Sequence, residues 1–319
     1  YMKDYAKKSY AKKGDEIVQL NYNAIDRGAN DIVEIEVDPA WANLEVTPLN
    51  EPKETAGCGG CCPTPSDFVK NIAKPINAIK GNDLPVSAFL GYEDGTFENG
   101  TSAFEKRGVA VDVPIWDVDK CIQCNQCSYV CPHAAIRPFL INEDELKASP
   151  EPLATKKPVG KGLDGLAYRI QVSALDCVGC GSCAHVCPAP GKALVMRPIA
   201  ESLEAHEDVK TDYLYNNVDY RSDLMPVDTV KGSQFSKPLF EFHGACPGCG
   251  ETPYIKLITQ LYGDRMMVAN ATGCSSIYSG SAPSTPYTTN KNGEGPSWGS
   301  SLFEDNAEYG FGMHVGVEA

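Results

Sequence analysis

Two segments with the same cysteine spacing decide the fold of this chain: CIQCNQCSYVCP at residues 121–132 and CVGCGSCAHVCP at residues 177–188. In each segment two residues separate the first three cysteines, and a fourth cysteine follows after three more residues, before a proline. Such steps fold three thiolates around one face of a [4Fe–4S] cubane, while the backbone amides between them donate hydrogen bonds to the cluster sulfurs. The duplicated pattern therefore predicts a ferredoxin-like domain with two [4Fe–4S] clusters, and it indicates one-electron transfer.

The ligands of the two clusters are expected to be crossed, because the fourth cysteine of such a segment binds the other cluster. The first cluster then takes Cys121, Cys124, Cys127 and Cys187, and the second takes Cys177, Cys180, Cys183 and Cys131. Zinc is a poor alternative, since zinc sites use one or two C-x-x-C pairs rather than duplicated triplets followed by Cys-Pro. His133 and His185 are expected to be hydrogen-bond or surface residues, because eight cysteines already supply all the ligands.

The composition of the chain restricts its possible partners, its compartment and the chemistry of its cysteines. With 319 residues, 42% of them hydrophobic, the chain is long enough for two or more cores, and its net charge of −14 argues against a nucleic-acid partner. It contains no apolar run long enough to span a membrane and no secretory signal. Most of its 14 cysteines lie in tight clusters, which favours metal ligation in a reducing compartment over disulfides. We expect a cytoplasmic protein, or one in a hydrogenosome-like organelle if the source is an anaerobic eukaryote.

Upstream of the cysteine segments, hydrophobic periodicity predicts a helix and a strand. The helix is expected from Asp15 to about Gly28, and the alternation over residues 32–37 is typical of a half-exposed strand. Downstream of the segments, residues 201–239 show no clear period and are expected to form a linker or a wrapping segment.

Towards the C-terminus the pattern indicates an α/β domain. A helix is predicted over residues 251–262, with Ile255, Ile258 and Leu261 facing inward. A strand is predicted within residues 265–272, and such an alternation of helix and strand is typical of α/β folds.

Cys246, Cys249 and Cys274 are candidate ligands of a third [4Fe–4S] cluster. Cys246 and Cys249 form a C-x-x-C pair before the predicted helix, and Cys274 follows the predicted strand, where α/β sheets present ligand-binding residues. One ligand is missing from this group. A redox-active dithiol is the alternative for the C-x-x-C pair.

Three further cysteines, Cys58, Cys61 and Cys62, are expected to be loop thiols. Adjacent cysteines rarely both bind one ion, and no fourth ligand is close in the sequence. We therefore expect them to be dispensable for metal content.

Several motifs resemble the single-chain pyruvate:ferredoxin (flavodoxin) oxidoreductases. They include both cysteine segments, KGNDLPVSAF at residues 80–89, HGACPGCGETPY at 243–254, TGCSSIY at 272–278 and GPSWGSSLFEDNAEYG at 295–310. The resemblance extends over nearly the whole chain, which looks like an internal fragment of such an enzyme.

The resemblance implies a multidomain protein of α/β and α+β class. Residues 1–59 would be the end of a coenzyme A-binding α/β domain, and 60–98 a connecting domain. Residues 99–220 would be the ferredoxin-like domain with two [4Fe–4S] clusters, and 221–319 the N-terminal part of a thiamine-diphosphate-binding α/β domain.

The resemblance also implies cofactors and partners. Cys246, Cys249 and Cys274 would bind a third cluster whose fourth ligand lies outside the chain, and Glu251 and Cys274 would lie against thiamine diphosphate. The Mg²⁺ signature of that cofactor is absent here, and no catalytic residue is expected within the chain.

The reaction implied for the whole enzyme is the oxidative decarboxylation of pyruvate with coenzyme A to acetyl-CoA and CO₂. Electrons would pass to ferredoxin or flavodoxin, and the full-length enzyme would be a homodimer. Two alternatives remain open at this point. One is a stand-alone iron–sulfur electron-transfer subunit, and the other is an oxidoreductase for a different 2-oxo acid.

Overall fold

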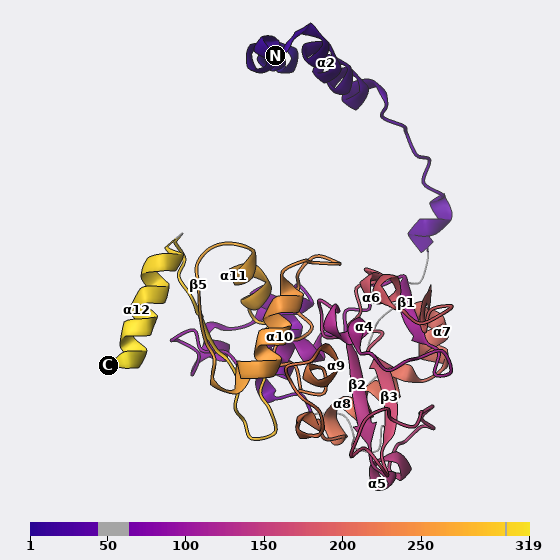
Figure 1. Ribbon diagram of the computed structural model, residues 1–319. Coiled ribbons are helices and arrows are strands. Elements are labelled where there is room, and N and C mark those ends of the chain that lie inside the picture. The colour runs from indigo at the N-terminus through magenta and orange to yellow at the C-terminus, as the bar shows by residue number, and fades with distance from the viewer. Residues whose placement is uncertain (44–63, 304) are drawn as a thin grey trace. The chain divides into compact units, whose positions relative to one another are not determined.

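The computed structural model describes residues 1–43, 64–303 and 305–319 (Figure 1). Contacts divide the chain into two compact units, one ending at Glu51 and the other beginning at Pro52. Both helices and strands are present. Within the described ranges, no helix is both long and apolar enough to cross a membrane.

The first unit is helical. α2 confirms the helix expected from Asp15, and Val18 is its buried residue. The strand expected over residues 32–37 is wrong, since these residues adopt no regular structure and no described segment pairs with them. A strand needs a neighbour to satisfy its backbone hydrogen bonds, which an alternating sequence alone does not supply. The elements of this unit are α1 (Met2–Tyr10), η1 (Ala11–Lys13), α2 (Asp15–Asn30) and η2 (Pro39–Asn43).

Residues 64–110 form a series of short helical turns with an aromatic core. The hydroxyl of Ser66 accepts a hydrogen bond from the backbone amide of Val69 at 3.2 Å, which caps the first turn. Phe68 packs against Tyr92 and Phe97, with ring centroids 5.1 and 5.4 Å apart. The elements are the π-helical η3 (Val69–Ala73), α3 (Lys74–Asn77), η4 (Gly81–Asp83), η5 (Val86–Phe89) and η6 (Thr101–Phe104).

The two cysteine segments are framed by two antiparallel strand pairs. β1 (Asp112–Trp116) pairs with β4 (Leu194–Pro198), and β2 (Ile136–Ile141) pairs with β3 (Ala167–Val172). Each segment also forms a short helix, α4 (Gln126–Tyr129) in the first and α6 (Ser182–Val186) in the second. The chain therefore runs twice through strand, cysteine segment, short helix and strand, and α5 (Glu143–Lys147) lies in the connection between the two halves.

Of the two expectations for residues 201–239, a linker is wrong, since part of this segment forms a helix that packs on the cluster-binding domain. α8 packs against β3 with a face on which Thr211, Tyr213 and Leu214 are all buried. The side-chain amide of Gln171 donates a hydrogen bond to Thr211 Oγ1 at 2.9 Å. Because hydrogen bonds satisfy polar side chains on the buried face, hydrophobic periodicity did not reveal this helix. The elements here are α7 (Ile199–Glu204), α8 (Glu207–Asn217), η7 (Ser222–Leu224) and α9 (Val230–Ser233).

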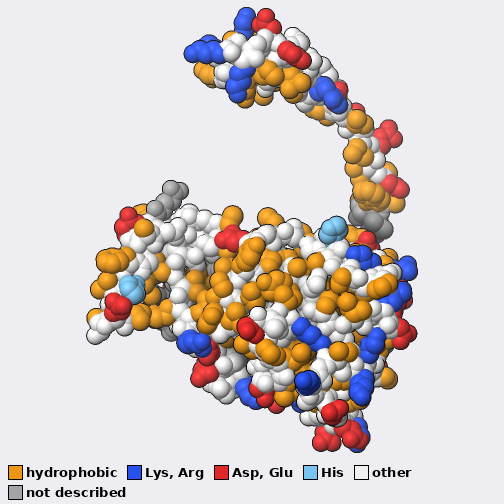
Figure 2. Space-filling view, viewed as in Figure 1, with side chains coloured by type: hydrophobic (Ala, Val, Ile, Leu, Met, Phe, Trp, Pro, Cys, Tyr) orange, Lys and Arg blue, Asp and Glu red, His pale blue; other side chains and the backbone are white. Residues whose placement is uncertain are grey.

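The C-terminal part contains a parallel strand pair with helices around it. The expected helix and strand are confirmed, but the inward face predicted for the helix is partly wrong: Lys256 and Thr259 are buried, whereas Ile258 is 41% exposed. The last helix exposes apolar side chains (Figure 2). The elements are α10 (Thr252–Tyr262), η8 (Gly263–Arg265), β5 (Met267–Asn270), α11 (Cys274–Ser279), β6 (Ser297–Ser300), which pairs with β5, and α12 (Asn306–Glu318).

A buried ion pair ties β2 to the segment that precedes Cys246. The guanidinium of Arg137 lies against the carboxylate of Glu241, and it donates to the hydroxyl of Tyr220 at 2.8 Å. Arg137 also stacks on Tyr215, 4.2 Å from the ring centroid. Arg137 is 2% exposed and Glu241 is 6% exposed, so each charge depends on the other for compensation.

Replacing Glu241 by Gln is expected to lower the free energy of unfolding by about 3–5 kcal/mol, because the charge of Arg137 stays buried without a counter-ion. Urea titration of the purified protein measures the loss. Glu143→Gln is the control. Its carboxylate pairs with Lys147 on the surface at 2.6 Å, and losing such a helical pair costs about 0.5 kcal/mol or less. A loss at Glu241 as small as that of the control would contradict the structural role of the pair.

Candidate metal centres

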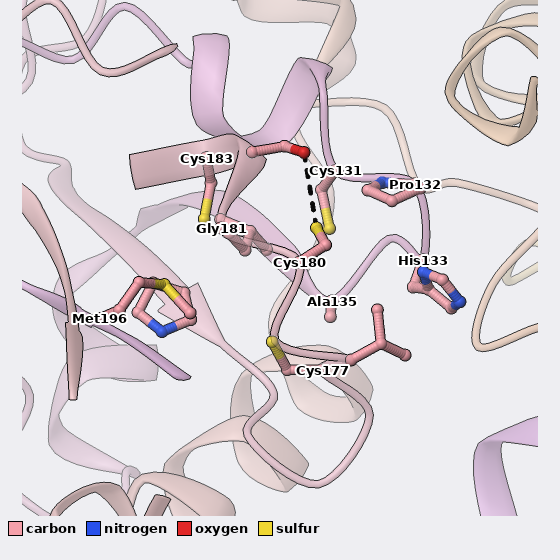
Figure 3. Close-up of a pocket in the computed structure, with 13 residues that line it drawn as sticks. Cys131, Pro132, His133, Ala135, Cys177, Cys180, Gly181, Cys183 and Met196 are labelled. Atoms are coloured by element: carbon pink, nitrogen blue, oxygen red, sulfur yellow. Dashed lines mark hydrogen bonds between the residues drawn. The ribbon is translucent and has the colours of Figure 1, made fainter. Parts of the chain in front are cut away.

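The structure gathers the eight cysteines of the duplicated motif around two cavities. One cavity is lined by Cys121, Cys124, Cys127 and Cys187, together with apolar residues that include Trp116 and Leu194. A second cavity is lined by Cys131, Cys177, Cys180 and Cys183 (Figure 3). Each cavity thus combines three cysteines of one segment with the last cysteine of the other, and these are the two sets that the crossed pattern predicts.

The two cysteine loops share one backbone conformation. Gln123 and Asn125 have φ of 60° in the first loop, and Gly179 and Gly181 have φ of 69° and 75° at the matching positions of the second. This left-handed conformation turns backbone amides toward the sulfurs. The amide of Gln123 donates to Cys121 Sγ at 3.4 Å, and the amide of Gly179 donates to Cys177 Sγ at 3.4 Å. Both loops therefore present amide donors to thiolate sulfurs in the same way.

Side-chain hydrogen bonds hold the first loop in a conformation that glycine adopts more easily. The side chain of Gln123 donates to the carbonyl of Lys157 at 2.7 Å and accepts from the amide of Val159 at 2.8 Å. The side chain of Asn125 accepts from the hydroxyl of Tyr168 at 2.7 Å. The connection between the two halves of the domain thus braces the first cysteine loop.

The buried cysteine thiols need a nearby cation before they can lose their protons. Burial raises the pKa of Cys127, and the charges of Cys121, Cys124 and Cys187 raise it further. Burial and the charge of Cys131 likewise raise the pKa of Cys177 to about 12, although the amide of Gly179 lowers it. Thiolates in these cavities repel one another, so binding must release protons and supply positive charge.

The donor set and the space fit iron–sulfur clusters. Four soft thiolates surround each cavity, and amides donate to several of their sulfurs, as such clusters require. Among the described residues, no three His, Cys, Asp or Glu side chains converge closely enough to hold a single metal ion. Thiolates spread around a cavity suit a cluster of several irons better than one zinc ion, whose bonds to sulfur are only about 2.3 Å long.

The two histidines beside these segments do not face the cavities as ligands. His133 is buried, its ring points away from the centre of the second cavity, and its Nε2 donates to the carbonyl of Ala245 at 3.1 Å (Figure 3). His185 is exposed at the surface, and its backbone carbonyl accepts from Lys192.

The third cysteine group lies at the start of two helices. Cys246 and Cys249 share one turn just before α10, in which the amide of Cys249 donates to the carbonyl of Cys246 at 3.1 Å. Cys274 is the first residue of α11, and both Cys246 and Cys274 are exposed. Burial raises the pKa of Cys249, but hydrogen bonds from the amides of Glu251 and Thr252 outweigh it and lower the pKa below its ordinary value.

The two helix starts are neighbours. Tyr278 on α11 packs in one cluster with Ala245, which precedes Cys246, and with Ile255 of α10, and its ring centroid lies 5.8 Å from that of His243. Glu251 precedes the first residue of α10. The three cysteines therefore lie in one region, but no metal-binding group of described residues includes them.

The turn that carries Cys246 and Cys249 packs on the second cavity. A Cβ placed on Gly248 would lie 3.6 Å from Cys180 Cβ, and Gly248 has φ of +73°. The rings of His133 and His243 stack with centroids 4.2 Å apart. Sequence reasoning missed this contact, because nothing in a single chain's spacing pairs two histidines that are far apart.

The two histidines exchange hydrogen bonds between the loops. Nε2 of His243 donates to the carbonyl of Pro132 at 2.5 Å, and Nε2 of His133 donates to the carbonyl of Ala245. The amide of Ala245 donates to Nδ1 of His243 at 3.2 Å, which fixes the neutral tautomer of that ring. Burial lowers the pKa of His133 to about 4 and that of His243 to about 3, so both rings are neutral at pH 7.

Cys58, Cys61 and Cys62 lie outside the described residues. Their expected role as loop thiols stays a prediction.

Comparison with protein families identifies two parts of the chain. Residues 120–190 match a 4Fe-4S dicluster domain, which supports the iron–sulfur interpretation of the two cavities. Residues 62–110 match a domain of unknown function.

Curated relatives match nearly the whole chain. The chain is 51% identical to a pyruvate:ferredoxin oxidoreductase of Moorella thermoacetica over 99% of its length, and 52% identical to a pyruvate-flavodoxin oxidoreductase of Enterobacter agglomerans over 100%. It is 47% identical to a pyruvate dehydrogenase [NADP(+)] of Cryptosporidium parvum over 99%. The chain spans 26% of the first two relatives and 17% of the third. The resemblance to these oxidoreductases is confirmed, and the chain corresponds to about a quarter of the first two.

Replacing Cys131 by Ser is expected to damage the cluster at Cys177, Cys180 and Cys183 rather than the cluster next to it in sequence, because Cys131 lines the second cavity. Iron content and EPR of the dithionite-reduced protein measure the loss. Cys187→Ser is the matched variant and should damage the first cluster instead. The reverse pattern of losses would show that the ligand sets are not crossed.

Proposed function

We propose that this chain carries the electron-transfer part of an oxidoreductase that converts pyruvate and coenzyme A to acetyl-CoA and CO₂. Its relatives, named pyruvate:ferredoxin and pyruvate-flavodoxin oxidoreductases, support this reaction and make ferredoxin or flavodoxin the proposed electron acceptor. The chain itself contributes thiolate ligands for three [4Fe–4S] clusters. Two belong to the cavities in residues 120–190, and the third is proposed at Cys246, Cys249 and Cys274.

One observation carries the proposal: the turn with Cys246 is fastened to the loop with Cys131. The carbonyls that the two histidines bind belong to Pro132 and Ala245, each of which is directly adjacent to one of these cysteines. A third cluster bound at this turn would be held at a short, fixed distance from the second cavity. Electron tunnelling falls steeply with distance, so such a fixed spacing is what transfer between two clusters requires.

The chain's residues perform three tasks at these sites. When bound, a [4Fe–4S] cluster accepts and releases one electron at a time. The cysteines lose their protons and hold iron, and the backbone amides of Gln123 and Gly179 donate to thiolate sulfurs. Apolar walls such as Trp116 and Ile170 exclude water. Burial and hydrogen bonds are the means by which a protein sets cluster potentials.

Thiamine diphosphate with Mg²⁺ is proposed to bind against Glu251 and Cys274, completed by residues outside this chain. The packing of Tyr278 on α11 against Ala245 and against Ile255 of α10 supports a shared site. The fourth ligand of the third cluster is also proposed to lie outside the chain. We assign no catalytic residue to these 319 residues.

The same proposal assigns a role to each part of the chain. Residues 1–59 would end a coenzyme A-binding domain, 60–98 connect it to the ferredoxin-type domain at 99–220, and 221–319 begin a thiamine-diphosphate-binding domain. The whole enzyme is proposed to be a cytoplasmic or organellar homodimer.

Replacing Cys249 by Ser in the full-length oxidoreductase is expected to remove about a third of the cluster iron and to abolish pyruvate-dependent reduction of ferredoxin, because a three-cluster protein loses one cluster. Dithionite should still reduce the two clusters of residues 120–190. Iron analysis, EPR and a ferredoxin-reduction assay measure these effects.

The matched control replaces Cys58, Cys61 and Cys62 by Ser together, and it should keep both iron and activity. Normal pyruvate-dependent reduction in the Cys249 variant would overturn the third cluster. Activity with another 2-oxo acid but not with pyruvate would overturn the proposed substrate.

A further inference from the structure

Lys256 is a buried cation in a place where a lysine is unexpected. It lies on α10, and its side chain is 1% exposed. Its ammonium donates to the carbonyls of Ser128 and Tyr129, the second at 3.2 Å, and to the side-chain oxygen of Gln234 at 3.2 Å. Burying a charged group away from water is costly, so a buried lysine needs strong local compensation.

The hydrogen-bond acceptors around Lys256 match its charged form. An ammonium group has three N–H donors, whereas a neutral amine has two. All three acceptors around Lys256 are oxygens, and two of them are backbone carbonyls in the last turn of α4. The geometry therefore suits an ammonium with every donor used.

Lys256 binds the short stretch of chain that joins the two cluster cavities. Ser128 and Tyr129 belong to the short stretch from Cys127, which lines the first cavity, to Cys131, which lines the second. Burial lowers the pKa of Lys256 to about 8, while the charges of Cys131 and Cys127 raise it and that of Arg137 lowers it. The groups that favour its charge thus include one cysteine from each cavity.

Other lysines near the cavities differ from Lys256 in exposure. Lys156 donates to the carbonyl of Cys121 at 3.0 Å, and Lys192 donates to the carbonyl of Cys187 at 2.7 Å. Lys156 is only partly buried and Lys192 is exposed. Water and salt screen an exposed charge, whereas a buried charge acts through a medium of lower dielectric constant. Lys256 is therefore the lysine of these three whose charge reaches the cavities with least screening.

We propose that Lys256 is an electrostatic positioning residue that raises the reduction potentials of both clusters in residues 120–190. Four thiolates make each cluster site negative, and each electron accepted adds one further negative charge. A fixed cation beside both sites stabilises the reduced state of each. Lys256 belongs to α10, which directly follows the turn that carries Cys249. The helix that begins beside the third site therefore also sets the electron affinity of the two clusters in residues 120–190.

This inference rests on the proposed function, since it requires clusters in both cavities. The test is an EPR-monitored redox titration of the cluster-loaded protein. Lys256→Met should shift the midpoint potentials of both clusters to more negative values, and Lys256→Arg, which keeps the charge, should shift them less. The control is Lys237→Met. Lys237 is a lysine that donates to the carbonyl of Thr289 at 2.9 Å, and the charged groups acting on its pKa are Glu241 and Arg137 rather than cysteines.

A second variant keeps the test decisive if Lys256→Met fails to fold. Gln234→Glu is nearly isosteric and places a negative charge against the ammonium, so it should shift both potentials in the same negative direction. Protein that folds but contains no iron and sulfide would overturn the proposed function. If cluster-loaded Lys256→Met or Gln234→Glu protein has the same midpoint potentials as the wild type and Lys237→Met, the role of Lys256 is overturned. The proposed function would not be affected by that result.

Discussion

Mutual repulsion among buried thiolates is the constraint on which the rest of this structure depends. Each cavity brings four cysteines together behind apolar walls. Burial raises the pKa of Cys127, Cys177 and Cys183, and the charges of neighbouring cysteines raise it further. Iron supplies most of the compensation when it binds. The protein supplies the remainder through amide donors, the left-handed loop turns and cations that bind loop carbonyls. The duplicated strand pairs serve to hold these loops at a fixed distance from each other.

Charged and polar contacts close to the cysteines join the C-terminal part to the cluster-binding part. Arg137 meets Glu241, His133 meets His243, and Lys256 reaches the end of α4. Each contact ends within a few residues of a cluster-lining cysteine. Polar contacts of this kind have strict geometry, so they fix distance and orientation as well as contributing stability. A protein that passes single electrons between sites gains from that rigidity, because spacing controls the rate.

Sequence reasoning found the parts of this structure that depend on local spacing. The cysteine steps gave the two cavities, and periodicity gave α2, α10 and β5. Sequence reasoning failed where the residues in contact are far apart in the sequence or are polar. Lys256 lies 128 residues from Ser128 and His243 lies 111 residues from Pro132, so no local pattern could pair them. The sequence predicts an apolar buried face for α10. Lys256 and Thr259 can be buried there because they form hydrogen bonds, and a single sequence does not reveal those hydrogen bonds. The strand expected over residues 32–37 is absent because an alternating sequence does not by itself provide a second strand with which to pair.

The most direct measurement is crystallography of the cluster-loaded protein with anomalous data collected at the iron edge. Crossed ligand sets predict two separate groups of four irons in residues 120–190. One should be bound by Cys121, Cys124, Cys127 and Cys187, and the other by Cys131, Cys177, Cys180 and Cys183. Single metal ions in the cavities, or four irons bound only by cysteines of one segment, would contradict the electron-transfer role of these two cysteine segments.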